Sequence, residues 1–230
     1  MNPPIERSNP RLMREMFGRI APRYDIFSRV FSYGLDRRWK RHSFEKIALP
    51  DGALVLDLAC GTGDFSKLVL ERFPKVRVFA ADLTEPMLNR ARFRGIPNVI
   101  CANASALPFA DGCFDCVFIG YALRSFANLT ATVREVERVI RPGGVFVALD
   151  FFLPANRFLR LVYLAYLYTM CAFWGVVLHG RPRIFTYIPN SLRSFVSVEH
   201  FSQLLRDAGY GCVEARPYIL GGIGLHWARK

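Results

Sequence analysis

The sequence has few acidic residues. Its 230 residues include 19 Asp and Glu against 31 Lys and Arg, which gives a formal net charge of +12. That balance argues against cationic partners and indicates attraction to anionic ones, nucleic acid and acidic membrane surfaces alike. Half of the excess lies in residues 1–46, where eleven basic and five acidic residues surround a peak at Arg37–Arg41. A solvated helix face explains that peak about as well as a binding surface does.

Paired metal-ligating motifs are also lacking. The six cysteines are scattered, and only Cys113 and Cys116 form a CxxC pair, without the second Cys or His pair that a zinc site needs. This pair lies in the apolar stretch "CFDCVFIGY", which is typical of a buried strand. We therefore interpret both cysteines as structural and expect no metal. Because no signal peptide precedes them, a reducing cytoplasm is the expected compartment.

Nothing in the chain resembles a second hydrophobic core, so we expect one domain over residues 1–230. Residues 1–47 carry apolar positions at helical spacing, divided by Pro22, and predict a helical cap. Strands and helices then alternate, which predicts an α/β fold with a doubly wound parallel sheet. The expected strands are 53–58, 76–81, 98–102, 114–121 and 144–151, and the expected helices are 64–73, 84–93 and 128–140, the last stopped by Pro142–Gly144.

An insertion at 152–196 interrupts this alternation. Within it, residues 158–178 hold a single charge, Arg160, and the stretch from Leu161 to Leu178 holds none. That length just reaches a membrane span, but three tyrosines, a threonine and Gly175 make a poor one. We favour a helical lid or interfacial helix, with a buried helix as the close alternative. A helix at 198–208 and two final strands, joined near Gly221 and Gly222, should follow and pair antiparallel at the sheet edge.

The stretch "DLACGTGD" at 57–64 lies between an expected strand and an expected helix, the usual place for a nucleotide-like ligand. It lacks the first glycine of GxGxxG, where Ala59 stands, and it keeps Gly61 and Gly63 for the turn. Asp57 and Asp64 flank the turn, so a pyrophosphate would meet two negative charges. A ligand with an ammonium and a sulfonium would be favoured, which points to S-adenosylmethionine.

Two further segments fit the same ligand. Asp82 follows the second expected strand about 20 residues after the turn, where a carboxylate can accept from both ribose hydroxyls; Leu83 comes next. Asn103 and Ala104 follow the third strand and would lie at the adenine. A nucleotide-binding fold of another kind remains the alternative.

The residues at this point resemble a known family, the class I methyltransferases that C-methylate the quinol ring in ubiquinone and menaquinone biosynthesis. The similarity covers nearly the whole chain, and its most specific blocks are the "APRYD" motif at 21–25 and the final "GGIGLH". Other matching blocks are "VLDLACGTGD", "NASALPFADGCFD", "YALRSFANLTATVREVERVIRPGGVF" and "YIPNSLRSF". The resemblance implies a Rossmann-like sheet with an antiparallel final strand and a demethylmenaquinone methyltransferase-like activity.

The resemblance also implies that Thr62, Asp82, Asn103 and Ala104 contact the cofactor. A further family contact, commonly a serine at the end of the fourth strand, falls on Gly120. The family's "FGLRN" reads "YALRS" here, which keeps Arg124 and replaces the usual asparagine with Ser125.

Methyl transfer to a ring carbon requires an ortho hydroxyl to lose its proton, so the site needs a base or an anion stabiliser. Arg124, at the carboxyl edge of the sheet, is the first candidate. Tyr24 is the second, with packing against the glycine loop as an equally good explanation. His226 is the third, although a lone histidine on an apolar strand is more often structural.

A basic N-terminal face and an apolar lid would let the enzyme lie on the inner face of an acidic membrane and reach a prenylated quinol. No N/D-P-P-Y motif follows the fourth strand, which argues against methylation of the amino groups of nucleobases. We therefore expect no nucleic-acid partner. A homodimer is compatible with the sequence. The alternatives are a methyltransferase for RNA or another small molecule, and a non-catalytic subunit of a quinone-synthesis complex.

Overall fold

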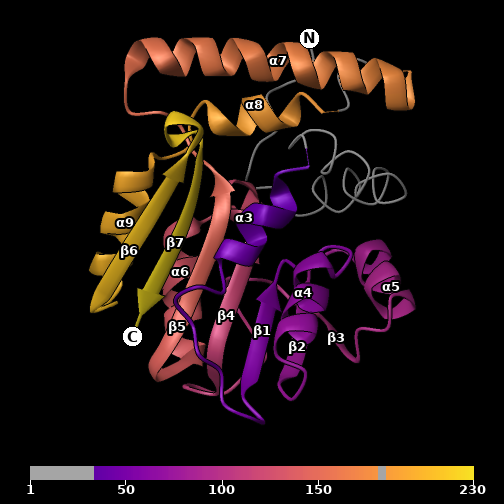
Figure 1. Cartoon of the computed structure of the whole chain (residues 1–230), viewed down its shortest axis with the longest axis vertical. Coiled ribbons are helices and arrows are strands. Elements are labelled where there is room, and N and C mark those ends of the chain that lie inside the picture. Colours follow the sequence, from indigo (N-terminus) through magenta and orange to yellow (C-terminus); the bar gives the residue numbers. More distant parts are fainter. Residues whose placement is uncertain (1–33, 181–184) are drawn as a thin grey trace.

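The computed structural model describes residues 34–180 and 185–230. Within these ranges, one seven-stranded sheet has the strand order β3-β2-β1-β4-β5-β7-β6 (Figure 1). Its strands are β1 (Leu54–Leu58), β2 (Arg77–Asp82), β3 (Asn98–Cys101), β4 (Phe114–Gly120), β5 (Ile140–Phe151), β6 (Cys212–Tyr218) and β7 (Ile223–Arg229).

The first five strands are parallel, and the last two are antiparallel to their neighbours. Leu58 of β1 lies between Ala81 of β2 and Ile119 of β4. Toward the β6 edge of the sheet, β7 pairs antiparallel with both β5 and β6. The strand order reverses between β1 and β4, as in a doubly wound sheet. The predicted fold class, including the antiparallel final strand, is confirmed.

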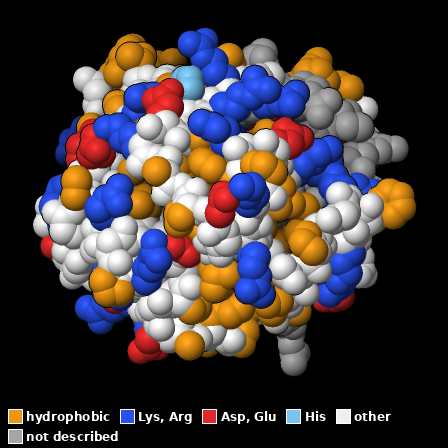
Figure 2. Space-filling view, turned by 60° about the horizontal axis from the view of Figure 1, so that its bottom comes forward, with side chains coloured by type: hydrophobic (Ala, Val, Ile, Leu, Met, Phe, Trp, Pro, Cys, Tyr) orange, Lys and Arg blue, Asp and Glu red, His pale blue; other side chains and the backbone are white. Residues whose placement is uncertain are grey.

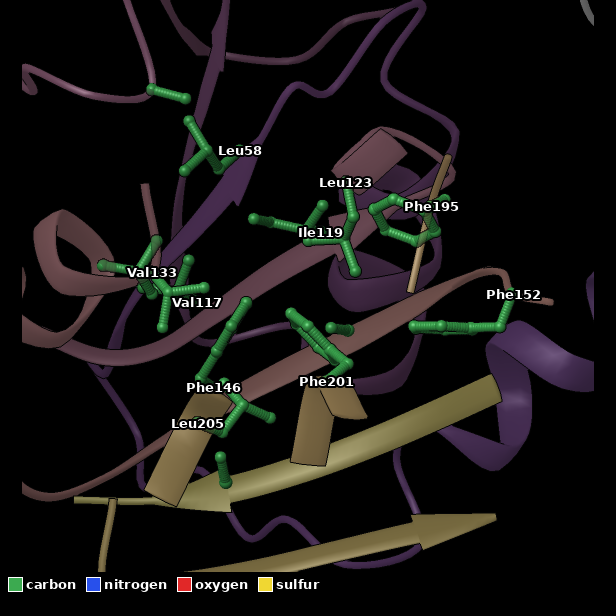
Figure 3. Close-up of a cluster of buried hydrophobic side chains, with 14 of the residues drawn as sticks. Leu58, Val117, Ile119, Leu123, Val133, Phe146, Phe152, Phe195, Phe201 and Leu205 are labelled. Atoms are coloured by element: carbon green, nitrogen blue, oxygen red, sulfur yellow. The ribbon is translucent and has the colours of Figure 1, made fainter. Parts of the chain in front are cut away.

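Helices cover both faces of this sheet. On one face lie α3 (Asp36–His42), α4 (Asp64–Arg72) and α5 (Glu85–Phe93); on the other lie α6 (Leu129–Val139) and α9 (Val198–Asp207). Alternate residues of the central strands supply the two cores: Leu56 and Ile119 face α6, and Val55 and Phe118 face α4. Figure 3 shows the first core, in which Phe152 and Phe201 come together at the α9 side. The uninterrupted apolar strands are thereby explained, since both faces are buried.

One boundary differs from the sequence prediction. Ile140 already pairs with Phe114 as the first residue of β5, so Pro142 and Gly143 do not separate a helix from a strand. A register shift follows between Phe114 and Cys116, and Arg141–Gly143 project into solvent. Residues 141–144 stand opposite Asp115 alone in this irregularity, so Pro142 does not have to donate a ladder hydrogen bond to β4, which the local sequence pattern does not reveal.

Two helices of the 152–196 insertion lie across the end of the sheet to which the parallel strands point (Figure 1). α7 (Arg157–His179) is continuous through Gly175, begins at an Asn156 cap and ends at Gly180 in the left-handed conformation. α8 (Tyr187–Leu192) lies beneath it, and the Tyr168 hydroxyl of α7 donates to Asn190 Oδ1 of α8 at 2.6 Å. The predicted helix exists; its action as a lid stays a prediction. Of the predicted cap at 1–47, only the part from residue 34 onward is described, and it contains α3.

By length and composition alone, α7 is the single helix of the described chain that reaches the size of a membrane span, at Arg157–Val177. Only 22% of that segment is buried, in contrast to a helix in the core of a soluble protein. On the face seen in Figure 2, basic side chains occur over most of the surface, among apolar and acidic ones, and several of them lie close together in its upper part.

Candidate active site

The predicted cofactor residues follow the carboxyl ends of four adjacent strands. The segment Ala59–Gly63 follows β1, Asp82 ends β2, Asn103 follows β3, and Gly120 ends β4. Because these strands are parallel and in register, the four segments emerge at one edge of the sheet. This edge includes the point between β1 and β4 where the strand order reverses, which is where ligands bind in sheets of this kind.

The turn after β1 depends on left-handed backbone conformations. Ala59, Gly61 and Gly63 have φ of 55°, 56° and 81°. A Cβ on Gly63 would lie 2.9 Å from the Ile96 side chain, so position 63 requires glycine for its conformation and for its packing. A Cβ on Gly61 would meet nothing within 4 Å, so the outer side of the turn is open. The Thr62 hydroxyl accepts a hydrogen bond from Arg94 Nη1 at 3.0 Å.

Asp82 connects β2 to this turn. Its Oδ2 accepts from the Gly61 N–H at 2.9 Å, and its Oδ1 accepts from the Thr84 N–H at 2.8 Å. Burial raises the pKa of this carboxyl, and the backbone donors oppose that shift. Asp82 is half-buried, and Leu83 beside it is half-buried as well, so both reach the surface next to the open side of the turn.

The two carboxylates that flank the turn each have a partner within the domain, which the local sequence does not show. Asp57 is fully buried, and its Oδ2 accepts from the Ser66 N–H and hydroxyl at 2.8 and 2.6 Å. Burial raises the pKa of Asp57 to about 7. Asp64 forms an ion pair with Lys40 of α3. The field at the turn is therefore less negative than the sequence suggests, because each carboxylate has a partner that is distant in sequence.

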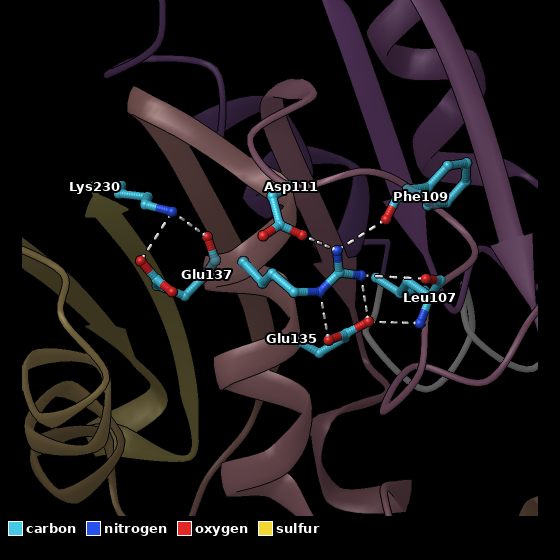
Figure 4. A network of polar contacts seen from close by, with 7 residues as sticks. Leu107, Phe109, Asp111, Glu135, Glu137 and Lys230 are labelled. Atoms are coloured by element: carbon cyan, nitrogen blue, oxygen red, sulfur yellow. Dashed lines mark hydrogen bonds and ion pairs between the residues drawn. The ribbon is translucent and has the colours of Figure 1, made fainter.

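Asn103 and Ala104 begin the connection from β3 to β4, which α6 holds in place. Arg138 of α6 donates to the carbonyls of Phe109 and Leu107 at 2.9 and 3.2 Å and to Glu135 at 2.7 Å (Figure 4). Asn103 is exposed, and its Oδ1 accepts from the Ser105 N–H at 3.1 Å. Ala104 is buried. The amide group of Asn103 is thus available at the surface on a well-supported loop.

Arg124 lies at the predicted edge, in the short helix η2 (Leu123–Ser125) after β4, but its charge is already paired. Its Nη1 donates to Asp150 Oδ1 at 2.6 Å and to the Tyr121 carbonyl at 2.8 Å, and Asp150 Oδ2 accepts from the Leu123 N–H at 2.6 Å. Both side chains are buried, at 2% and 0% exposure. Stabilising a phenolate would require Arg124 to share or leave Asp150, at a large cost for a buried pair. The geometry favours Arg124 as a positioning residue for η2.

The other two catalytic candidates differ in outcome. His226 on β7 is fully buried between Phe152 and Phe201, and its Nε2 is 3.1 Å from the Val198 carbonyl. Burial lowers its pKa to about 4, so the ring is neutral at physiological pH. A proton acceptor must reach the substrate, and this position favours the structural interpretation. Tyr24 lies outside the described residues.

The family model for ubiE/COQ5 methyltransferases matches residues 6–230 of the chain. The chain belongs to this family. Two relatives show the degree of similarity. The ubiquinone/menaquinone biosynthesis C-methyltransferase UbiE of Desulfotalea psychrophila is 35% identical over 222 residues, covering 95% of this chain and 90% of the relative. The demethylmenaquinone methyltransferase of Thermus thermophilus is 37% identical over 200 residues, covering 85% and 91%.

Solved structures agree on the fold of this family member. A SAM-dependent methyltransferase from Thermotoga maritima superposes with a TM-score of 0.66 at 19% identity, covering 94% of this chain and 99% of that structure. A methyltransferase from Bacillus halodurans superposes with a TM-score of 0.59 at 19% identity, covering 83% and 98%. S-adenosylmethionine is the cofactor of the family, and the open turn at Gly61 beside the Asp82 carboxylate suits a ligand that carries a ribose diol.

Packing explains the departure at Gly120. A Cβ at this position would lie 2.7 Å from Cδ2 of Phe65, closer than side chains approach one another. The Phe65 ring is buried against Phe118 and Phe44, at centroid distances of 5.2 and 6.4 Å. The serine that the resemblance leads one to expect at 120 would therefore overlap Phe65. In this chain the Phe65 ring occupies the space that a serine side chain at position 120 would need.

Sequence reasoning missed Asp150 and Lys40 as members of this region. Asp150 is a carboxylate inside the apolar strand "VFVALDFF", and a buried charge needs a partner, so it could have been linked to a nearby arginine. In the sequence, Lys40 is one of several basic residues in the peak at Arg37–Arg41. It is 5% exposed and also lies over the rings of Phe65 and Tyr121, at 6.0 and 5.7 Å. No local pattern distinguishes it from its solvated neighbours.

Proposed function

We propose that this protein transfers a methyl group from S-adenosylmethionine to a ring carbon of a prenylated quinol in menaquinone or ubiquinone biosynthesis. The observation that carries the proposal is the match to a quinone methyltransferase family from residue 6 to residue 230. Relatives at 35% and 37% identity carry names from both pathways, so the chemistry is argued for the quinol class and for neither ring in particular.

The cofactor roles follow from the edge described above. S-adenosylmethionine supplies the electrophilic methyl group. Asp82, held by the Gly61 and Thr84 amides, accepts from the ribose hydroxyls. Gly61 and Gly63 keep the turn open to the cofactor, while Asn103 and Ala104 contact the adenine. The reaction requires the ring carbon to be held about 3 Å from the methyl group, so most of the rate comes from positioning.

Arg124 contributes through position. Its ion pair with Asp150 and its bond to the Tyr121 carbonyl hold the turn that leaves β4. This turn begins at Gly120, next to the cofactor edge, and Tyr121 has a left-handed φ of 61° that the arginine helps to maintain. We therefore expect Arg124→Ala to slow methyl transfer strongly because the turn relaxes.

Because the proposed substrate lies in the membrane, a membrane surface is the expected partner. A polyprenyl quinol resides in the bilayer, so an enzyme with a net charge of +12 and an apolar helix beside its site would work on the acidic inner face of the membrane. The chain has no N/D-P-P-Y motif after β4, which favours this assignment over a nucleic-acid partner. A homodimer stays a prediction, and light scattering tests it.

The test is an incubation with isotopically labelled cofactor and two quinols, one of the naphthoquinol type and one of the benzoquinol type. We expect mass analysis to show one methyl group gained on a ring carbon of at least one quinol. Asp82→Ala should abolish the gain and weaken cofactor binding in calorimetry, whereas Asp51→Ala, which removes an exposed ion pair with Lys75, should leave both unchanged. No methylation of either ring, or full activity in Asp82→Ala, would contradict the proposal.

A further inference from the structure

One face of α7 is apolar and exposed along its whole described length. The exposed large apolar side chains form two groups at helical spacing, one before and one after the exposed Thr169, and together they make one strip along the helix. Phe158 is 70% exposed, and the other members are Leu161, Val162, Tyr166, Phe173, Val176 and Val177. Soluble monomers rarely expose so long an apolar strip, and such strips mark contact surfaces.

The opposite face of α7 is held by the domain. Tyr163, Leu167 and Cys171 are buried in the same core as β4, β5 and α9. They lie one turn apart, so the helix is attached to the domain over successive turns. A helix that crossed a bilayer would have to pull this face out of the core. The contact surface is therefore available to something that lies alongside α7, with the helix axis parallel to it.

A second exposed apolar group lies next to this helix. In η3 (Ile219–Gly221), between β6 and β7, Ile219 and Leu220 have φ of 48° and 53°, although neither is glycine. Branched residues rarely adopt this conformation. Their side chains nevertheless point into solvent, with Leu220 74% exposed. Within the described part of the chain, Ile219 is 52% exposed and Leu220 74% exposed, so burial offsets only part of this strain, and a contact outside the chain is a reason to keep it.

The turn and the helix form one unit. The Tyr163 hydroxyl of α7 donates to the Gly222 carbonyl at 2.7 Å. A Cβ on Gly222 would lie 2.7 Å from the Tyr163 ring, so the turn packs closely against the second turn of α7. Figure 1 shows η3 below the amino-terminal end of α7. Leu220 and the strip of α7 therefore move together with the domain.

The charge around this surface selects its partner. From Phe151 to Val198 the chain contains five arginines and no aspartate or glutamate. Arg157 at the start of α7 and Arg193 after α8 are exposed. Residues 215–230 also lack acidic side chains. A second copy of the chain would bring the same positive charge to the contact, whereas anionic lipid headgroups are complementary to it.

We propose that the exposed strip of α7 and the Ile219–Leu220 turn together insert into the interface of an anionic lipid bilayer, with α7 parallel to the membrane plane. The choice of a membrane rests on the proposed function, because the substrate resides there. Interfacial helices of this kind insert their apolar side to the boundary between headgroups and acyl chains and leave the charged groups in the headgroup layer. The carboxyl edge of the sheet then faces the bilayer from which the quinol must come.

The test uses the full chain and vesicles of phosphatidylcholine with or without phosphatidylglycerol. Leu220→Asn is the sharpest variant, because asparagine tolerates the left-handed conformation and removes the apolar side chain. We expect it to fold with equal or higher thermal stability and to partition onto the anionic vesicles about tenfold more weakly. Phe158→Ser should weaken partitioning similarly. The matched control is Phe93→Ser at the end of α5, which removes an aromatic ring that is 94% exposed and outside this surface.

Orientation is tested by the fluorescence of Trp174, the half-buried tryptophan of α7, since Trp39 and Trp227 are buried in the core. Lipids brominated near the headgroup should quench it, and lipids brominated at the chain ends should not. Quenching by the chain-end bromines would indicate a spanning helix. Unchanged vesicle binding of Leu220→Asn and Phe158→Ser would overturn the assignment, as would a dimer in solution that Phe158→Ser dissociates.

A short-chain, water-soluble quinol separates this inference from the proposed function. Leu220→Asn should methylate it at the wild-type rate, because the variant affects only membrane contact. If the wild-type protein methylates no quinol, the proposed function fails, whatever the vesicles show. If it methylates the soluble quinol and both surface variants bind vesicles normally, the surface assignment alone fails.

Discussion

Replacing Gly120 with serine, the residue that the resemblance leads one to expect there, tests the packing around Phe65. The added Cβ would lie 2.7 and 3.0 Å from two carbons of the Phe65 ring. The ring has nowhere to move, because Phe118 and Phe44 pack against it. Overpacking of this kind costs about 1–3 kcal/mol. In a chain of this size we expect a melting midpoint lower by roughly 2–4 °C for each kcal/mol.

Chemical denaturation of three variants measures this effect. Phe65→Leu shortens the ring side chain, so Gly120→Ser combined with Phe65→Leu should be less destabilised than the sum of the two single changes, by about 1–2 kcal/mol. Gly211→Ser is the control: it has no neighbour within 4 Å of its Cβ and no left-handed φ, so it should stay within about 0.5 kcal/mol of the wild type. Equal stability of Gly120→Ser and Gly211→Ser, or strict additivity in the double variant, would refute the reasoning.

Two further predictions concern buried titratable groups. The folded-state pKa of Asp57 is about 7 against an ordinary 3.8, so the folded state binds the proton more tightly than the unfolded state. The contribution of Asp57 to the free energy of unfolding therefore falls as pH rises from 4 to 7. In urea unfolding measured across this range, Asp57→Asn should reduce that fall. His226 acts in the opposite direction, because its folded-state pKa of about 4 lies below the ordinary 6.5 and the unfolded state binds the proton more tightly. As pH drops from 6.5 to 4, the free energy of unfolding of the wild type should therefore fall more steeply than that of His226→Gln. If His226 is structural, His226→Gln also keeps the wild-type turnover at pH 7.5; a large loss of kcat in a folded variant would restore it as a catalytic candidate.

The sequence alone was enough for the sheet and for the expectation that the glycine turn and Asp82 lie at one edge of it. Apolar runs such as "ALVLDLA" form strands, and the turn at 59–63 follows from residues adjacent in the chain, so local patterns contain the information. The order of strands and helices then brings Gly61 and Asp82 to the same edge, and their hydrogen bond at 2.9 Å agrees with that expectation.

Which charges and side chains meet depends on the packing of the whole domain. Asp57 and Asp64 look alike as neighbours of a glycine turn, yet one bonds to Ser66 inside the core and the other pairs with Lys40, 24 positions away. Arg124 meets Asp150 across 26 positions. The same holds for α7: its composition is compatible with a span, a lid or a core helix, and only the packing of one face against the domain shows which face remains exposed. Local sequence specifies backbone conformation, whereas partners distant along the chain are chosen by the packing of the whole domain.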